Sequence, residues 1–174
     1  KDDNWVNSAN IAPAILYGGS FLMAPTNDWP DAMLWLKTNT PEDAKILSWW
    51  DYGYWIESLA DRTTYLDNAT LDSQIIEKTA QMYYSSPDDA WKELVAIDAD
   101  YVLIWVTAER VLSSSDLPMY LVGVGGGDES KRFWFAEVAG VPLEKYFFDD
   151  FISGPNAFWN DTLLGKMIPF SPRM

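Results

Sequence analysis

The chain has 174 residues, 48% of them hydrophobic and 22% charged, which is the composition of a globular domain rather than of a disordered segment. Its 12 Lys and Arg against 26 Asp and Glu give a formal net charge of −14, which disfavours nucleic acid as a partner. Because Cys and His are absent, disulfides and thiolate or imidazole metal sites are excluded, and only oxygen ligands remain for a cation.

No run of 18 or more apolar residues occurs, so the sequence predicts no membrane span. The longest apolar stretch is IAPAILYGGSFLMA at residues 11–24, which Pro13 and two glycines interrupt. We expect it to be a connector that packs against the protein. The chain begins with neither an initiator Met nor a signal-peptide pattern, and we expect it to be a piece of a larger protein.

Capping residues and apolar spacing predict alternating helices and strands in the first part of the chain. In order, we expect a helix over 28–37, a helical turn at 41–44, a strand over 45–49, a helix over 52–59 and a strand within 62–67. Helices over 71–84 and 86–97 follow, then a strand within 98–106 that is apolar enough to be buried on both faces, and a helix over 128–140.

This order predicts an α/β fold in which helices predominate and cover a small parallel or mixed sheet. We expect residues 1–174 to form a single domain with its core at about 28–140. Four prolines and scattered aromatic residues favour an irregular segment over 141–174.

The motif WWDYG at residues 49–53 directly follows a predicted strand. An indole N–H only donates hydrogen bonds and an ionised Asp only accepts them, whereas a hydroxyl does both. Trp49, Trp50 and Asp51 are therefore suited to grip a ligand hydroxyl, and Gly53 permits the sharp turn into a helix. The alternative is that the paired tryptophans are ordinary core residues.

A second candidate site lies in GVGGGDESKRFWFAEVAG at residues 123–140. Asp128 and Glu129 would repel a phosphate, so we interpret the glycines as the lead into a helix rather than as a phosphate loop. Asp128, Lys131 and Phe135 are spaced three and four residues apart and thus share one helical face. The alternative is an ordinary surface ion pair.

Together, WWDYG and the later Asp128-x-x-Lys131 resemble the C-terminal globular domain of the catalytic subunit of oligosaccharyltransferase, in its archaeal and eukaryotic form. WPDAMLWLKTNTPEDAKILSWWDYG and ADRTTYLDNAT are also similar to segments of this family. The resemblance covers about residues 28–140. The WWDYG signature is specific, whereas Asp-x-x-Lys alone is weak.

The resemblance implies the C-terminal domain of a membrane enzyme that transfers a lipid-linked oligosaccharide to the Asn of Asn-x-Ser/Thr in an acceptor polypeptide. Its signature, here Trp49, Trp50 and Asp51 with Tyr52 and Gly53, would bind the Ser or Thr hydroxyl. The family also assigns Asp128 and Lys131 to this pocket, with Phe135 standing where Met or Ile is usual.

The same resemblance places the catalytic acidic residues and their divalent cation, Mn or Mg, in a membrane-embedded part that precedes this domain. We therefore expect no catalytic residue, metal or cofactor in these residues, and no activity from the chain alone. The domain would lie at the extracytoplasmic face of the cell membrane or in the ER lumen, anchored by a multi-pass transmembrane region.

Two other function classes fit parts of the pattern. Tryptophans beside a carboxylate also suit a free-standing carbohydrate-binding module, and a glycosidase would need two carboxyl groups that flank the scissile bond. Acidic pairs such as Asp88 with Asp89 or Asp149 with Asp150 are more typical of solvated surface than of Ca²⁺ sites. The sequons at Asn68 and Asn160 leave open whether either is glycosylated.

Overall fold

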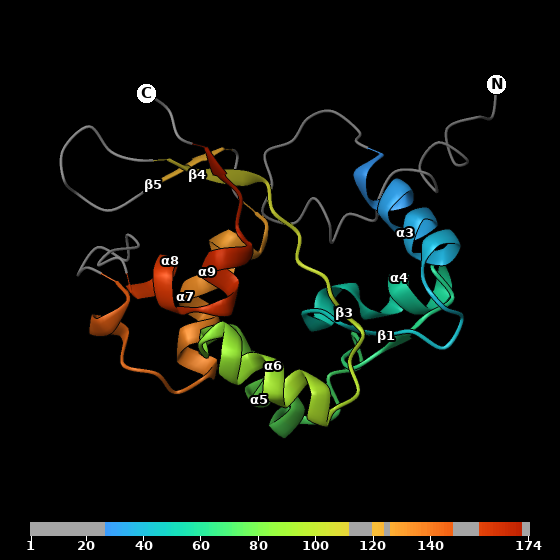
Figure 1. Ribbon diagram of the computed structural model, residues 1–174, viewed down its shortest axis with the longest axis horizontal. Coiled ribbons are helices and arrows are strands. Elements are labelled where there is room, and N and C mark those ends of the chain that lie inside the picture. The colour runs from blue at the N-terminus through green and yellow to red at the C-terminus, as the bar shows by residue number, and fades with distance from the viewer. Residues whose placement is uncertain (1–26, 112–119, 124–125, 148–156, 172–174) are drawn as a thin grey trace.

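The computed structural model describes residues 27–111, 120–123, 126–147 and 157–171 (Figure 1). Its helices are α3 Asp28–Asn39, α4 Gly53–Ser58, α5 Ser73–Tyr84, α6 Pro87–Ala96, α7 Asp128–Val138, α8 Ala157–Asp161 and α9 Leu163–Met167, with 3-10 turns η1 Trp50–Tyr52 and η2 Leu143–Lys145. Its strands are β1 Lys45–Leu47, β2 Thr63–Thr64, β3 Tyr101–Val102, β4 Ala108–Val111, β5 Tyr120–Gly123 and β6 Phe170–Ser171. None of these helices is both long and apolar enough to cross a lipid bilayer.

The sheet that carries the WWDYG motif is small and parallel, as predicted. β1 lies between β2 and β3 and is parallel to both, with Ile46 opposite Thr64 on one side and Tyr101 on the other. β1 ends at Leu47, two residues earlier than predicted, but Trp49 keeps an extended conformation. The chain therefore passes from the end of β1 through an extended Trp49 directly into η1.

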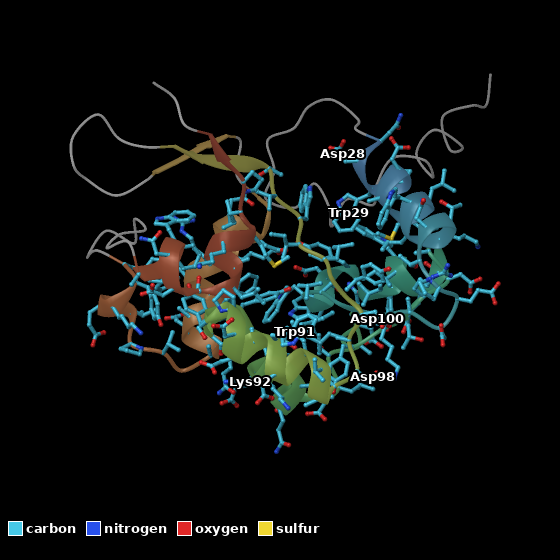
Figure 2. The ribbon with its side chains drawn as sticks, viewed as in Figure 1. Asp28, Trp29, Trp91, Lys92, Asp98 and Asp100 are labelled. Carbon is cyan, nitrogen blue, oxygen red and sulfur yellow. The ribbon has the colours of Figure 1, made fainter. Side chains whose placement is uncertain are left out.

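The strand predicted within 98–106 is wrong in its length and in its burial. Only Tyr101–Val102 pair as β3, and residues 101–106 are half-buried rather than enclosed on both faces. Asp98 and Asp100 lie in the turn before β3 (Figure 2) and bind Lys45, the first through the ammonium group at 2.6 Å and the second through the backbone N–H at 2.9 Å. Residues 101–102 join the sheet and residues 103–106 pack against the hydrophobic core, so the apolar run extends beyond the strand.

α5 and α6 agree with the predicted capping signals, whereas the helical turn predicted at 41–44 is a single turn outside any helix. Asp72 accepts hydrogen bonds from the first turn of α5, and Ser86 does the same for α6, which has Pro87 in its first turn. The helix predicted over 52–59 divides into η1 and α4, and α7 ends before Gly140, whose φ of +66° suits glycine. In Figure 1, α3 and α4 lie beside the parallel sheet, and α7, α8 and α9 gather on the opposite side of the molecule.

The prediction of an irregular segment over 141–174 is wrong in part. Within its described residues, α8 contributes Phe158 and α9 contributes Leu164 to the main hydrophobic core, Ile168 directly after α9 joins them, and Thr162 caps α9. β6 then pairs parallel to β4, and β5 pairs antiparallel to β4 on its other side. These three strands form a second sheet that the sequence did not predict.

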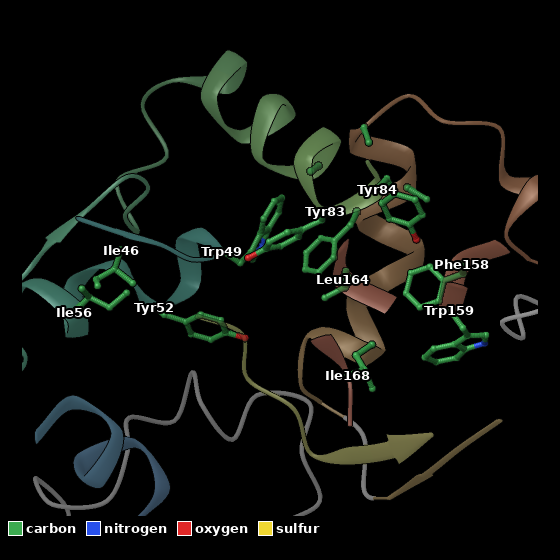
Figure 3. Packing of buried hydrophobic residues seen from close by; sticks show 14 of the residues in the cluster. Ile46, Trp49, Tyr52, Ile56, Tyr83, Tyr84, Phe158, Trp159, Leu164 and Ile168 are labelled. Carbon is green, nitrogen blue, oxygen red and sulfur yellow. The ribbon is translucent and has the colours of Figure 1, made fainter. Parts of the chain in front are cut away.

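The core joins the two halves of the molecule through aromatic side chains (Figure 3). Trp49 and Tyr83 come from the WWDYG turn and from α5, and both pack against Phe135 of α7, with ring centroids 4.5 and 5.3 Å from that of Phe135. Phe135, Tyr83 and Phe158 are fully buried. Packing on this scale fixes the position of α7 relative to the parallel sheet.

Arg62, which precedes β2, holds α3 against the parallel sheet. Its guanidinium group donates hydrogen bonds to the carbonyl oxygens of Lys37 and Thr40 at 2.7 and 2.8 Å, and to the Thr40 hydroxyl at 2.8 Å. Further bonds reach the carbonyls of Ala60 and Asp61. Arg62 is only 6% exposed and lies at the C-terminal end of α3. Its cation therefore pairs with carbonyl groups that have no helical partners there.

We predict that Arg62→Met lowers the free energy of unfolding by about 2 to 4 kcal/mol, because several buried carbonyls lose their donor. Arg62→Lys should recover little of this loss, since an ammonium group cannot reproduce the planar fork. Urea denaturation measures both values. Lys37→Met, at an exposed position of the same helix, is the control, and equal effects of the Arg62 and Lys37 changes would contradict the assignment.

Candidate functional site

The WWDYG turn lies where β1 meets η1 and α4, and Gly53 is required there by space. A side chain at Gly53 would begin 2.2 Å from the carbonyl oxygen of Leu66 and 2.4 Å from Cα of Asp67, which is closer than atoms can approach. The turn is thus pressed against the loop that follows β2. Trp49 is only 6% exposed, so its ring belongs to the core rather than to the surface.

The first turn of α7 supplies the second half of the site. Asp128 is fully buried, and its carboxylate accepts a hydrogen bond from the backbone N–H of Trp105 at 2.9 Å. The Asp128 N–H donates in return to the Trp105 carbonyl at 2.6 Å. This reciprocal pair, one bond to the Asp128 carboxylate and one from its backbone N–H, ties the beginning of α7 to the segment that follows β3.

Four polar side chains join the two halves. The Tyr52 hydroxyl donates to Asp128 Oδ1 at 2.7 Å and accepts a hydrogen bond from Lys131 Nζ at 3.0 Å. Lys131 also forms an ion pair with Asp51 Oδ2, and its ammonium group lies 3.5 Å from Asp128 Oδ1. The predicted residues Asp51, Tyr52, Asp128 and Lys131 therefore meet, although the two segments are far apart in the sequence.

Burial raises the pKa of the Asp128 carboxyl group to about 6, although the nearby Lys131 ammonium and the hydrogen bond from Tyr52 act in the opposite direction. Burial also raises the pKa of the Tyr52 hydroxyl, and the Asp128 carboxylate adds to this effect. Tyr52 consequently keeps its proton and acts as a donor. The Asp128 carboxyl group is therefore mostly ionised at neutral pH.

The predicted site residues divide into a buried set and a reachable set. Tyr52, Gly53, Asp128 and Phe135 are buried, as is Trp49. The side chains of Asp51 and Lys131 are 18% and 24% exposed, and Trp50 is half-buried. A ligand at the surface would contact Asp51, Lys131 and Trp50, and the buried residues support these side chains.

The reachable carboxylate has one oxygen to spare. Asp51 Oδ2 binds Lys131, whereas Oδ1 accepts no hydrogen bond from any residue within the described ranges. The ammonium group of Lys131 donates hydrogen bonds to Asp51 and Tyr52 and forms an ion pair with Asp128, so its charge already has partners within the cluster. The arrangement therefore presents one oriented acceptor to a ligand, and a hydroxyl or amide donor fits it.

Sequence reasoning missed two residues that hold the site. Glu129, predicted only to repel phosphate, is fully buried and accepts hydrogen bonds from the Thr107 hydroxyl at 2.6 Å and from the Gly127 N–H at 3.3 Å. Asn68, which the sequence marked as a sequon and as part of the family-like segment ADRTTYLDNAT, hydrogen-bonds the backbone of the WWDYG turn. The acidic pair at the start of a helix was a usable signal for Glu129, whereas nothing local indicated the partners of Asn68.

Neither a metal site nor the apolar cavity beside the start of α3 coincides with this cluster. Among the described residues, no three acidic side chains lie close enough together to hold a cation. A cavity of about 400 Å³ lies between α3, α9 and residues 103–106, and its lining includes Trp29, Trp105 and Met167. It contains none of the predicted site residues, so the site is defined by its polar contacts rather than by this cavity.

The raised pKa of Asp128 predicts a measurable pH dependence of stability. Between pH values of about 4 and 6 the folded chain binds more protons at this carboxyl group than the unfolded chain does, so the group's contribution to stability falls as pH rises. The free energy of unfolding of Asp128→Asn, relative to the unsubstituted chain, should therefore rise across this window by on the order of 2 kcal/mol.

Urea denaturation at several pH values measures this difference. Asp31→Asn, at an exposed position of α3, reports the effect of removing one surface charge from an acidic chain. A difference for Asp128→Asn that stays constant or falls between pH 4 and 6 would mean that burial does not raise this pKa.

Comparison with known proteins relates this arrangement to glycosyltransferase subunits. The chain matches no protein-family model. It is 36% identical over 132 residues to the dolichyl-diphosphooligosaccharide–protein glycosyltransferase subunit STT3B of Oryza sativa subsp. japonica, which covers 71% of this chain and 18% of that protein. It is 37% identical over 102 residues to the STT3 subunit of Dictyostelium discoideum, covering 58% of this chain and 14% of that one.

The fold has a counterpart among solved structures. The crystal structure of the C-terminal globular domain of oligosaccharyltransferase from Archaeoglobus fulgidus aligns with a TM-score of 0.54 over 83% of each chain, at 24% identity. The present chain spans less than a fifth of the length of the curated relatives above. The resemblance inferred from WWDYG is confirmed: the chain is a homologue of STT3 subunits that corresponds to their C-terminal part, and it has the fold of an oligosaccharyltransferase C-terminal globular domain.

Proposed function

We propose that this chain is the acceptor-recognition domain of an oligosaccharyltransferase that transfers a lipid-linked oligosaccharide to the Asn of Asn-x-Ser/Thr. Asp51 accepts a hydrogen bond from the Ser or Thr hydroxyl, and Trp50 covers that contact. Tyr52, Asp128 and Lys131 orient Asp51. The transfer chemistry and its divalent cation belong to a membrane-embedded part, which anchors the domain at the extracytoplasmic face or in the ER lumen.

The observation that carries the proposal is the oriented, reachable carboxylate of Asp51. Lys131 engages one of its oxygens, and the other accepts no hydrogen bond from the described residues. An acceptor held in this way distinguishes a side chain with a hydroxyl from one without it, because the unmet carboxylate loses its solvation when the peptide binds. A Val in place of Thr has the same shape but offers no donor.

Two observations disfavour the other function classes. A carbohydrate-binding module built on WWDYG would need both tryptophan faces exposed, but Trp49 packs against Phe135 and Tyr83 and is only 6% exposed. A glycosidase needs two carboxyl groups on either side of a bond, but Asp51 and Asp128 both lie against Lys131 and Asp128 is fully buried. The hydroxyl-sorting role uses the same residues without either difficulty.

We predict that Asp51→Asn and Lys131→Gln in the full-length enzyme raise KM for an Asn-x-Thr peptide by about 10- to 100-fold and change kcat less. A hydrogen bond to a charged acceptor contributes about 1.5 to 3 kcal/mol, and its loss weakens ground-state and transition-state binding alike. Steady-state transfer to a fluorescent acceptor peptide at saturating lipid-linked donor measures both constants.

The matched control removes a similar ion pair that lies away from the site. Lys92 pairs with Asp89 at 2.7 Å on the exposed side of α6, so Lys92→Gln should leave KM unchanged. If Asp51→Asn and Lys131→Gln gave the same KM as Lys92→Gln, the proposed recognition role would be refuted.

A further inference from the structure

The loop after β2 is built against the WWDYG turn. The absence of a side chain at Gly53 lets the backbone of Leu66 and Asp67 approach the turn directly. Asp67 then closes the loop by accepting a hydrogen bond from the Ala69 N–H at 2.7 Å, and Thr70 follows at the exposed surface. Asn68 is thereby held beside the main chain of Asp51 and Tyr54.

The side-chain amide of Asn68 makes two hydrogen bonds of opposite polarity to this main chain. Its Nδ2 donates to the carbonyl of Asp51 at 3.0 Å, and its Oδ1 accepts from the N–H of Tyr54 at 3.1 Å. Tyr54 lies in the first turn of α4, where backbone N–H groups have no helical partner. No local side chain caps α4, so Asn68 supplies the cap from a loop 14 residues further along.

Both contacts need a side chain of this length that offers one donor and one acceptor. A carboxylate accepts at both oxygens and would face the Asp51 carbonyl with a second acceptor, and an alkyl side chain would leave both backbone groups unpaired. Asn68 also begins the sequon Asn68-Ala-Thr70, and N-glycosylation would attach a sugar to the same Nδ2 atom. The two uses of this nitrogen compete, because the amide is partly buried against the turn.

From this geometry we infer that Asn68 is a positioning residue of the acceptor site and is not itself glycosylated. Its amide fixes the backbone of Asp51 from the side of the β2 loop, while Lys131 fixes the Asp51 carboxylate from the side of α7. The inference rests on the proposed recognition role of Asp51. According to this inference, the Asn68 amide and the Lys131 ammonium group together set the direction of the Asp51 carboxylate.

The experiment compares Asn68→Ala, Asn68→Asp and Thr70→Ala in the full-length enzyme. All three destroy the sequon, but only the Asn68 variants remove the amide. We expect KM for an Asn-x-Thr peptide to rise at least tenfold in both Asn68 variants, with kcat changed less, and to stay within twofold in Thr70→Ala. Thr70 is exposed, and no hydrogen bond from its hydroxyl to a described residue is found.

Peptide mass mapping of the unsubstituted full-length enzyme supplies a second readout that does not depend on how any variant folds. The peptide containing Asn68 should carry no glycan, and substantial occupancy at Asn68 would overturn the inference. An increase of KM in Thr70→Ala equal to that in Asn68→Ala would also overturn it, because the sequon rather than the amide would then matter.

Unchanged KM values in both Asn68 variants would overturn the inference as well. Asp51→Asn and Lys131→Gln, measured alongside, separate this outcome from failure of the recognition role. If these two raise KM while the Asn68 variants do not, the recognition role stands and only the positioning by Asn68 is wrong. If none of the four raises KM, both are wrong.

Discussion

A fully buried carboxylate, Asp128, is the constraint on which the rest of the site depends. Burying a charge without partners is costly, so the surrounding groups must provide donors. The Trp105 N–H, the Tyr52 hydroxyl and the Lys131 ammonium meet this requirement, and they come from three separate segments of the chain. Satisfying one carboxylate therefore fixes the relative positions of the WWDYG turn, the segment after β3 and α7.

Asp51 benefits from this arrangement without sharing the burial. Lys131 is held by Asp128 and Tyr52 behind it, so its contact with Asp51 orients a carboxylate that remains in reach of a ligand. On the other side, the Asn68 amide holds the Asp51 backbone. A site built in this way begins with the acceptor already in position, and a binding peptide loses less free energy in ordering it.

The sequence was sufficient to predict most of the fold and the motif residues. Capping signals located α5 and α6 to within two residues, and the strand-turn-helix pattern around Gly53 placed Asp51 at the end of β1. The face that each aromatic residue presents was not predictable. Trp49 was expected to offer an indole to a ligand, yet the structure places it in the core, and its contact with a ligand remains a prediction.

Features made by long-range pairing escaped prediction for a common reason. β6 is two residues long and pairs with β4, which lies far away in the sequence, so no local periodicity marks it. The Asn68 amide also acts across a loop, and its sequon left open only whether it is glycosylated. Local propensity and spacing describe neighbours along the chain, whereas these contacts are decided by packing.

The central claim is that this cluster sorts acceptor side chains by the presence of a hydroxyl. The most direct test is photo-cross-linking of the full-length enzyme with matched peptides that carry Asn-x-Thr or Asn-x-Val and a photoreactive group beside the last position. Our account predicts strong labelling of the segment around Trp50 by the Thr peptide and at least severalfold weaker labelling by the Val peptide. Equal labelling of that segment by the two peptides would contradict it.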